Sequence, residues 1–256
     1  IGLTSTTPNY ITFGQQAAGQ TAGSLKGYMA NLRFIQGSGA YNAASTTITI
    51  PTAPPTATAT TQLLLNCTNA GIIDSTAKNV LETVGNAQIS TTQSKFGGSS
   101  MYFDGTGDYL QLLVGNQNTN LGTGDFTVEF WLYPNSWVAN GTVVYKTSTF
   151  SIQRYGSNSN IGVTVPSGWL ITDATLPSTG TWTHVAVTRS GTSVKVWING
   201  TQSGSTGTSS ASLSFEQIGG QGASYEYNGY IDDLRVTKFC RYTANFTPPT
   251  SAFQLQ

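Results

Sequence analysis

The chain offers few side chains that could do acid-base chemistry. His184 is the one histidine among 256 residues, alongside eleven Asp and Glu residues. A Ser-His-Asp hydrolase would need a serine on a sharp turn such as G-x-S-x-G, and the sequence contains none. A retaining glycosidase would need two carboxyl groups about 5 Å apart. Only Asp232 and Asp233 are adjacent, and adjacent strand residues face opposite sides, so we expect no catalytic site and a structural His184.

The aromatic residues are better suited to binding. Aromatic faces stack on sugar rings and also anchor protein interfaces, because both uses bury a large flat surface. The candidate contacts with a glycan or a protein partner are Trp131, Tyr133, Trp137, Tyr155, Trp169, Tyr225 and Tyr227. Trp137 and Trp169 lie in expected loops and are the strongest candidates. For each residue the alternative is packing beneath a loop.

Residues 181–200 are expected to form the centre of the scaffold that positions these side chains. Apolar residues alternate with other residues in 183–187 and again in 194–198, and Ser190-Gly191-Thr192 separates the two runs. This alternation predicts two antiparallel strands, each with one apolar face. Asn199-Gly200 suits a type I′ turn, because both residues tolerate positive φ, so a further strand is expected from Thr201.

Three more segments continue this pattern: SSMYFDGTGDYLQL (99–112), FTVEFWLYP (126–134) and GYIDDLRVTKFCRY (229–242). In 126–133, one face is expected in a core (Phe126, Val128, Phe130, Leu132), and the other is aromatic with a single acid, Glu129. No long helix is expected, and sequential short strands indicate an all-β, two-sheet antiparallel sandwich.

With W-x-H-V-A (182–186) and W-I-N-G (197–200), these segments resemble the laminin G-like, or concanavalin A-like, jelly-roll domain over roughly residues 60–250. The resemblance implies a jelly-roll sandwich. Its motifs are strand and turn signatures, so the resemblance predicts the fold and leaves the activity open.

The resemblance also implies a calcium site, since relatives with this fold often hold Ca²⁺ in loops at one rim, with carboxylates, carbonyls and water as ligands. The candidate ligands are Asp104 and Asp108, in the Gly-rich turn, with Asp232 or Asp233. The alternative is hydrogen bonding within the turn and at a strand end. Glucanases of this fold would carry E-x-D-x-x-E on one strand. The chain lacks that motif, which makes a glucanase-like hydrolase the weakest alternative.

Composition favours an extracellular or virion-surface protein. Charged residues make up 9% of the chain, 29 residues are glycine, and the formal net charge is +0. Without a basic field to hold phosphates, nucleic-acid binding is not expected. No window of 18 apolar residues is present, so we expect no membrane insertion.

An internal repeat sets the expected domain organisation. GYMANLRFIQGSGAY (27–41) is similar to 229–242, and ITIPTAPP (48–55) is similar to FTPPTSAF (246–253). We therefore expect the C-terminal strands of a preceding jelly-roll copy at 1–50, a Pro/Thr linker at 51–61, a complete copy at 62–247 and the start of the next linker at 248–256. The partial copy would need strands from upstream residues or from another chain. Chance similarity is the alternative.

Two cysteines lie near the first and last expected strands of the complete copy. Cys67 and Cys240 could form a disulfide if those strands are neighbours. The alternative is two half-buried thiols, and the spacing alone leaves both outcomes open.

The resemblance implies a non-enzymatic structural or adhesive module of a virion, in a tail, fibre or capsid-associated protein, or of a microbial surface assembly, because similar jelly-roll domains occur in such proteins. Its expected partners are other subunits of that assembly and cell-surface glycans, with Ca²⁺ as the one candidate cofactor. The alternative is a dedicated carbohydrate-binding lectin module of a secreted protein. A glycan array separates the two, because a purely structural module should bind nothing above background.

Overall fold

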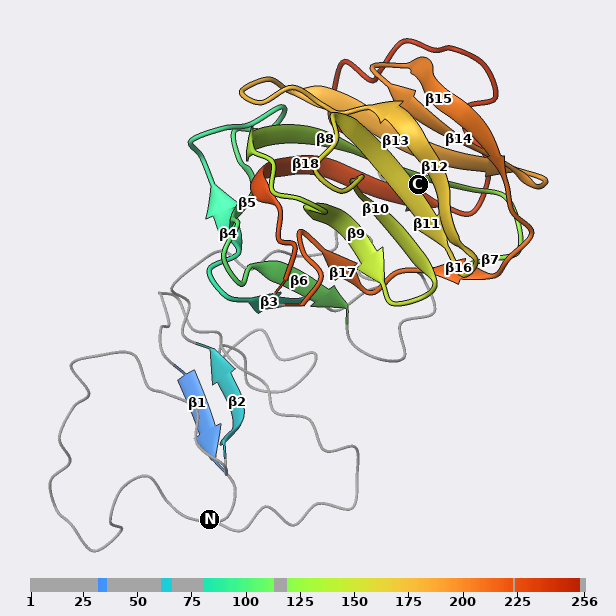
Figure 1. The fold of residues 1–256 in the computed structure, drawn as a ribbon. Coiled ribbons are helices and arrows are strands. Elements are labelled where there is room, and N and C mark those ends of the chain that lie inside the picture. The colour runs from blue at the N-terminus through green and yellow to red at the C-terminus, as the bar shows by residue number, and fades with distance from the viewer. Residues whose placement is uncertain (1–31, 36–60, 66–80, 113–118, 223, 254–256) are drawn as a thin grey trace, which may run out of the picture. The chain divides into compact units, whose positions relative to one another are not determined.

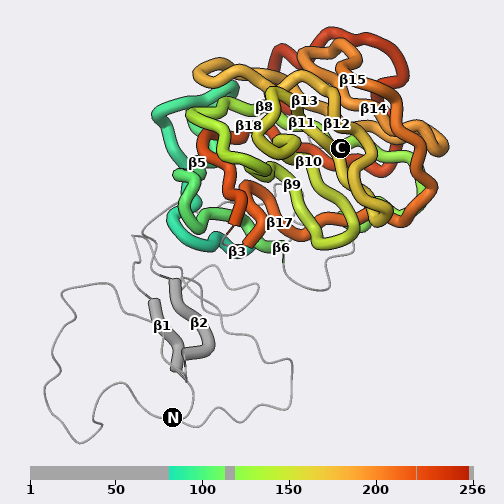
Figure 2. The backbone as a smooth tube through the Cα atoms, viewed as in Figure 1, coloured from blue at the N-terminus to red at the C-terminus, as the bar shows by residue number. Residues whose placement is uncertain are grey.

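The computed structural model describes residues 32–35, 61–65, 81–112, 119–222 and 224–253 (Figures 1 and 2). The chain divides into two compact units, Ile1–Thr68 and Asn69–Gln256, and each is described by itself. The described residues form strands and turns without an α-helix, which confirms the all-β prediction. Among them, no helix is long and apolar enough to cross a membrane.

In the first unit, β1 (Leu32–Ile35) pairs antiparallel with β2 (Thr61–Leu65). Strand β2 thus begins next to residue 62, the predicted start of the complete copy, and its described partner is β1. The rest of the predicted partial copy at 1–50, nearly all of the linker at 51–61, and Cys67 lie outside the described residues. The repeat and the disulfide therefore stay predictions.

The second unit is a sandwich of two seven-stranded antiparallel sheets, which form two layers in Figure 1. The first sheet has the order β12 (Gly168–Thr175), β11 (Asn160–Val165), β10 (Phe150–Arg154), β9 (Thr142–Lys146), β17 (Gln217–Ile218), β6 (Tyr109–Leu112), β3 (Leu81–Val84). The second has the order β15 (Thr201–Thr208), β14 (Ser193–Ile198), β13 (Thr183–Ser190), β8 (Phe126–Ser136), β18 (Asn228–Thr237), β5 (Ser100–Asp104), β4 (Gln88–Ser90). A small sheet pairs β16 (Leu213–Ser214) with β7 (Asn120–Gly122).

The predicted hairpin lies within the second sheet. Strands β13 and β14 pair from Val185 opposite Ile198 to Ser190 opposite Ser193, and β15 follows directly. At the second turn φ is 49° for Asn199 and 79° for Gly200, both positive as a type I′ turn requires. The structure therefore confirms this hairpin and the strand after it.

The hydrophobic core lies between the inner faces of the two sheets. Strand β8 supplies Phe126, Val128, Phe130 and Leu132, all fully buried as the alternation predicts. Each side chain of this kind contributes about 1.5–3 kcal/mol when it leaves water. On the first sheet Phe150 and Ile152 of β10 point into the same core, so the residues that alternate with them face outward.

The outer face of the second sheet is covered by the C-terminal strap, which we define as residues 239–253. The backbone N–H of Phe246 donates to the carbonyl of Gly200 at 2.8 Å, and that of Phe253 donates to Asp233 Oδ2 at 2.8 Å. The Phe246 ring packs on the edges of His184 and Trp197. The strap therefore stays on this sheet as far as Phe253, past the predicted domain end at 247.

Candidate functional site

One row of side chains crosses the whole outer face of the first sheet. Each residue in the row is the pairing partner of the next, so all of them share one face. From β12 to β3 the row consists of Trp169, Thr164, Ser151, Tyr145, Gln217, Gln111 and Glu82. On the middle strands core residues lie on both sides of the row, as Phe150 and Ile152 flank Ser151 and Leu110 and Leu112 flank Gln111. The face is thus polar and largely uncharged, with Trp169 at one end and Tyr145 in the middle.

Hydrogen bonds between neighbours hold the row in place. The hydroxyls of Ser151 and Thr164 lie 2.6 Å apart, and Gln217 Nε2 donates to Gln111 Oε1 at 2.9 Å. From the loop beside the row, Gln221 Nε2 donates to the Tyr145 hydroxyl at 2.9 Å. Side chains fixed in this way lose little conformational freedom when a ligand binds.

A shorter second row lies next to the first. Gln153 on β10 pairs with Thr142 on β9 and with Gly162 on β11. The Thr142 hydroxyl lies 3.2 Å from Gln153 Oε1 and donates to the Asn140 carbonyl at 2.8 Å. The second row therefore places a side-chain amide beside the middle of the first row.

Trp169 presents one face of its indole to solvent. It is 41% exposed, and its ring lies over Gly162, where a Cβ would come within 2.5 Å of the ring. Tyr155 supports the indole edge-on, with ring centroids 4.7 Å apart. Gly162 thus gives the indole room to lie close to the sheet.

Tyr225 is the second exposed aromatic residue near these rows. It is 44% exposed, and its carbonyl accepts the backbone N–H of Thr142 at 2.9 Å. Its φ is 56°, a conformation that a bulky side chain rarely adopts. Of the predicted aromatic contacts, the structure thus places Trp169, Tyr155 and Tyr225 around the outer face of the first sheet.

The other predicted aromatic residues lie elsewhere. Trp131 and Tyr133 belong to β8 of the second sheet. Trp131 is buried below Lys95, and Tyr133 is half-buried against Trp182. Tyr227 is fully buried in the core. Trp137 is half-buried on Tyr227 and donates its indole N–H to the Pro177 carbonyl. Trp131 and Tyr227 are part of the packing, so neither is carried forward as a ligand contact.

The aspartates in the Gly-rich turn accept backbone N–H groups from their own turn and from the turn between β3 and β4. The backbone N–H of Thr106 donates to Asp104 Oδ1 at 2.7 Å, and that of Asp104 donates to Asp108 Oδ2 at 2.8 Å. Asp108 is fully buried and also accepts the backbone N–H of Asn86. These are the turn bonds that formed the alternative to a metal site.

Asp232 and Asp233 hold neighbouring segments on the second sheet. Asp232 Oδ2 accepts the backbone N–H of Lys95 at 2.8 Å, and Asp233 Oδ2 accepts that of Phe253 in the strap. Among the described residues, no three His, Cys, Asp or Glu side chains are placed to hold a metal ion. The expected convergence of Asp104 and Asp108 with Asp232 or Asp233 is therefore not found.

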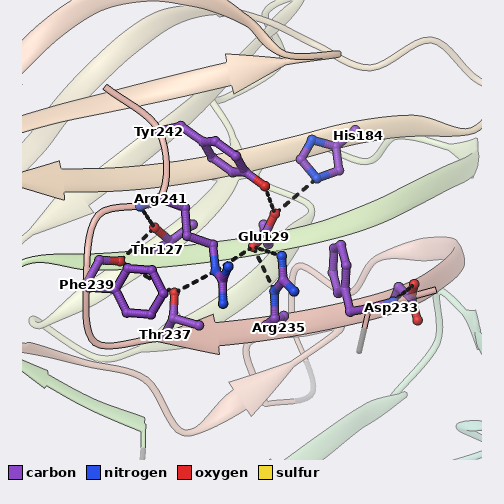
Figure 3. A network of polar contacts seen from close by, with 10 residues as sticks. Thr127, Glu129, His184, Asp233, Arg235, Thr237, Phe239, Arg241 and Tyr242 are labelled. Atoms are coloured by element: carbon purple, nitrogen blue, oxygen red, sulfur yellow. Dashed lines mark hydrogen bonds and ion pairs between the residues drawn. The ribbon is translucent and has the colours of Figure 1, made fainter. Parts of the chain in front are cut away.

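A buried polar network lies beneath the strap, on the second sheet (Figure 3). Glu129 of β8 is fully buried and accepts Arg235 Nε at 2.9 Å and the Tyr242 hydroxyl at 2.8 Å. His184 Nε2 lies 3.4 Å from Glu129 Oε2, an ion-pair distance outside hydrogen-bond geometry. Arg241 of the strap reaches the same carboxylate at 3.5 Å. Glu129 thus ties the strap to the sheet.

The charges in this network shift two pKa values in opposite directions. Burial raises the pKa of the Glu129 carboxyl, but His184, the Arg235 guanidinium and the Tyr242 hydroxyl outweigh burial and hold that pKa below its ordinary value. Burial and the negative charge of Glu129 raise the pKa of Tyr242 to about 12. At neutral pH Glu129 is therefore ionised and Tyr242 is a neutral donor to it.

Sequence reasoning did not identify the polar members of either row. Ser151 and Gln153 alternate with Phe150 and Ile152, which marks them as outward-facing. Their assembly with Gln111 and Gln217 depends on pairing between strands far apart in the chain. A search for Gln, Ser and Thr at outward positions of every expected strand could have found the set but not its order.

Comparison with known proteins identifies the family of the fold. The sequence profile of the concanavalin A-like lectin/glucanases superfamily matches residues 104–243, more than half of the chain. The comparison with curated protein sequences gives no match. Domain 4 of AbnA, a GH43 extracellular arabinanase from Geobacillus stearothermophilus solved with arabinotriose, is similar at 20% identity and a TM-score of 0.46, over 62% of this chain and 81% of that chain.

The binding domain of botulinum neurotoxin serotype D/C is similar at 14% identity and a TM-score of 0.46. The match covers 63% of this chain and 44% of that chain, so it spans less than half of the neurotoxin domain. The binding domain of botulinum neurotoxin serotype G is similar at 11% identity and a TM-score of 0.47, over 66% of this chain and 46% of that chain.

Proposed function

Because the chain belongs to the concanavalin A-like lectin/glucanases superfamily, we propose that its second unit is a non-enzymatic module that binds glycans on the outer face of the first sheet. The observation that carries this proposal is the row of paired side chains from Trp169 to Glu82, in which every member except the buried Ser151 is at least partly exposed. At the spacing of neighbouring strands, the row extends roughly 30 Å, enough for several sugar rings.

The chemistry of the row suits a sugar chain. A pyranose offers an apolar ring face and an edge of hydroxyls. The exposed indole of Trp169 can stack on the ring face. Side-chain amides and hydroxyls both donate and accept hydrogen bonds, as sugar hydroxyls do. The bonds already made within the row keep these groups in position before a ligand arrives.

The absence of catalysis is part of the proposal. Glycosidic bond cleavage needs a pair of carboxyl groups at the ligand. Glu129, the fully buried glutamate, lies under the strap on the other sheet, bound to Arg235 and Tyr242. The row itself ends in one acid, Glu82. A glycan bound along the row should therefore remain intact.

We also propose a setting for this module: an exposed adhesive element of a virion or microbial surface assembly, with other subunits of that assembly as partners. The similarity of 27–41 to 229–242 supports a tandem array, in which repeated weak sites add up through avidity. The low charge of the chain fits an extracellular location. The alternative setting is a secreted lectin with a single such module, and the number of copies encoded around this segment separates the two.

A glycan array tests the proposed function. The full chain should bind a defined set of glycans, and Trp169→Ala should lose them without a change in melting temperature, because the indole lies at the surface. Phe239→Ala is the matched control, since Phe239 is 49% exposed but follows β18 of the second sheet. No binding by the wild-type chain would refute the proposal, and so would equal losses in both variants.

A further inference from the structure

We infer that the ligand is an uncharged saccharide and that the side-chain amide of Gln153 binds one of its hydroxyl groups. This inference rests on the proposed function and names the class of ligand for the same face. Gln153 alternates on β10 with Phe150 and Ile152 in the core, so it projects outward beside Ser151 of the row.

One end of this amide has open hydrogen-bonding capacity. The Gln153 side chain is buried to an exposure of 8%, and its Oε1 contacts the Thr142 hydroxyl. Its Nε2 donates to no described residue, and it is not among the buried atoms that lack a partner, so it reaches solvent. A largely buried amide with a free polar end is stable only when water or a ligand satisfies it. The free end of Gln153 is therefore a preformed recognition group.

Each strand partner of Gln153 contacts an exposed aromatic residue. Gly162, under the Trp169 ring, is the cross-strand partner of Gln153 on one side. Thr142, whose backbone N–H donates to the Tyr225 carbonyl, is its partner on the other. Each partner lies one strand away, about 5 Å. A sugar that contacts the amide is thus placed between Trp169 and Tyr225.

The backbone of Tyr225 supports this arrangement. A tyrosine with φ of 56° is strained, and such strain persists where the surroundings fix the residue. Its carbonyl is fixed by Thr142, and Gln221 in the same loop binds the Tyr145 hydroxyl. The loop therefore holds Tyr225 at the edge of the face that carries Gln153.

Charge on this face argues for an uncharged ligand. The guanidinium of Arg154, next to Gln153, already donates to the carbonyls of Trp137, Asn158 and Ser157. Lys146 pairs with Glu216 at 3.3 Å. Among the described residues of the two rows no cation is present, and Glu82 is an acid. A sialic or uronic acid would lose hydration here without gaining a counter-ion.

The test uses the full chain and an array that carries each oligosaccharide in a neutral, a sialylated and a uronic-acid form. We expect the neutral forms to bind and the acidic forms to bind at least tenfold more weakly. Calorimetry with the best neutral oligosaccharide then compares three variants. Gln153→Ala removes the amide, Gln153→Glu keeps its shape and removes donors, and Tyr225→Asn removes the ring but keeps a residue that tolerates positive φ.

We expect each of the three variants to weaken binding at least tenfold at an unchanged melting temperature, while Phe239→Ala binds as wild type does. If the Gln153 variants lower the melting temperature, the inference is tested by two other measurements. These are the affinity of Tyr225→Asn and the ratio of the wild-type affinities for neutral and acidic glycans. A preference for acidic glycans overturns the inference and leaves glycan binding intact. The inference is also overturned, with glycan binding intact, if the Gln153 and Tyr225 variants bind with wild-type affinity while Trp169→Ala loses binding. Failure to bind any glycan overturns the proposed function as well.

Discussion

At Trp169 a neighbouring glycine determines how the aromatic ring is presented. Any side chain at Gly162 would displace the indole, since a Cβ there would lie 2.5 Å from it. The sequence alone predicts Trp169 as an exposed loop residue, because Ser167-Gly168 precede it. Trp169 is exposed, but the loop prediction is wrong, since it is the second residue of β12. The sequence cannot predict Gly162 as the support, because that role depends on how β11 and β12 pair, including a bulge between Val163 and Thr164.

Burial separates the aromatic residues that the sequence groups together. Trp131 and Tyr133 alternate with core residues on an aromatic strand face, and the sequence left ligand contact and packing open for both. Trp131 is packed, since it lies under Lys95 and edge-on against Phe96. Coverage by segments distant in the chain has no local signal, which is why the sequence could not separate Trp131 from Trp169.

Glu129 gives a prediction for acid stability. Its pKa is lower in the folded chain than in the unfolded chain, so its contribution is full above the ordinary glutamate pKa of about 4.3 and is lost as the pH falls through the lower folded value. Glu129→Gln should remove this dependence and destabilise the domain by about 3 kcal/mol at neutral pH, because Arg235 loses its buried partner. Urea unfolding between pH 3 and pH 7 measures both effects. Parallel pH profiles for variant and wild type would contradict the prediction.

Tyr242 gives the corresponding prediction at alkaline pH. Its pKa is raised from 10.0 to about 12, so its contribution is complete below pH 10 and is lost as the pH rises toward 12. Tyr242→Phe cannot ionise and should lose less stability than wild type over that interval. Equal losses in wild type and variant, measured by thermal melts at pH 9 and pH 11, would show that Tyr242 does not control this loss.

Among the elements, the β14–β15 turn and the strap form one unit. The carbonyl of Gly200 accepts the Phe246 N–H, and a Cβ at Gly200 would lie only 1.9 Å from the Phe246 oxygen. The turn thus needs glycine twice, for its positive φ and for the approach of the strap. The sequence shows the first need through Asn199-Gly200, but the second depends on residues 46 positions later in the chain.

Gly200→Ala should therefore destabilise the domain more than strain alone can explain. Gly191→Ala is the matched control, because Gly191 also has positive φ, of 58°, but a Cβ there meets nothing within 4 Å. We expect a loss of about 1 kcal/mol for Gly191→Ala and of at least twice that for Gly200→Ala, measured by denaturant unfolding. Equal losses would show that the strap does not rest on this turn.

Strands with a local sequence pattern could be predicted, whereas strands defined only by pairing with distant segments could not. Strands β8, β13, β14 and β15 follow from alternation and turn residues that lie within a few positions of each other. Strand β17 has only two residues, Gln217–Ile218, yet it joins β9 to β6 in the first sheet. A strand this short has no period to detect, so the sequence predicts the sandwich without predicting the row that crosses it.

For the whole molecule, the described carboxylates predict independence from calcium. Asp104, Asp108 and Asp232 are each occupied by backbone N–H groups, and they do not form a group that could hold a metal. Melting temperatures in EDTA and in millimolar Ca²⁺ should be equal. A ligand at 100 times its Kd would add about 2.7 kcal/mol to the free energy of unfolding, so a higher melting temperature in Ca²⁺ would reveal a site.

The central claim, that glycans bind across the outer face of the first sheet, is tested most directly by an NMR titration of the ¹⁵N-labelled full chain with its best array ligand. Trp169 contributes one of five indole N–H signals, and Gln111, Gln153 and Gln217 contribute side-chain amide signals. We predict that the signals of Trp169 and these amides shift and saturate together. The indole signals of Trp131 and Trp197, which are buried on the second sheet, should not shift. Shifts confined to Trp131, Trp197 and the strap would place the ligand on the other sheet and contradict the account.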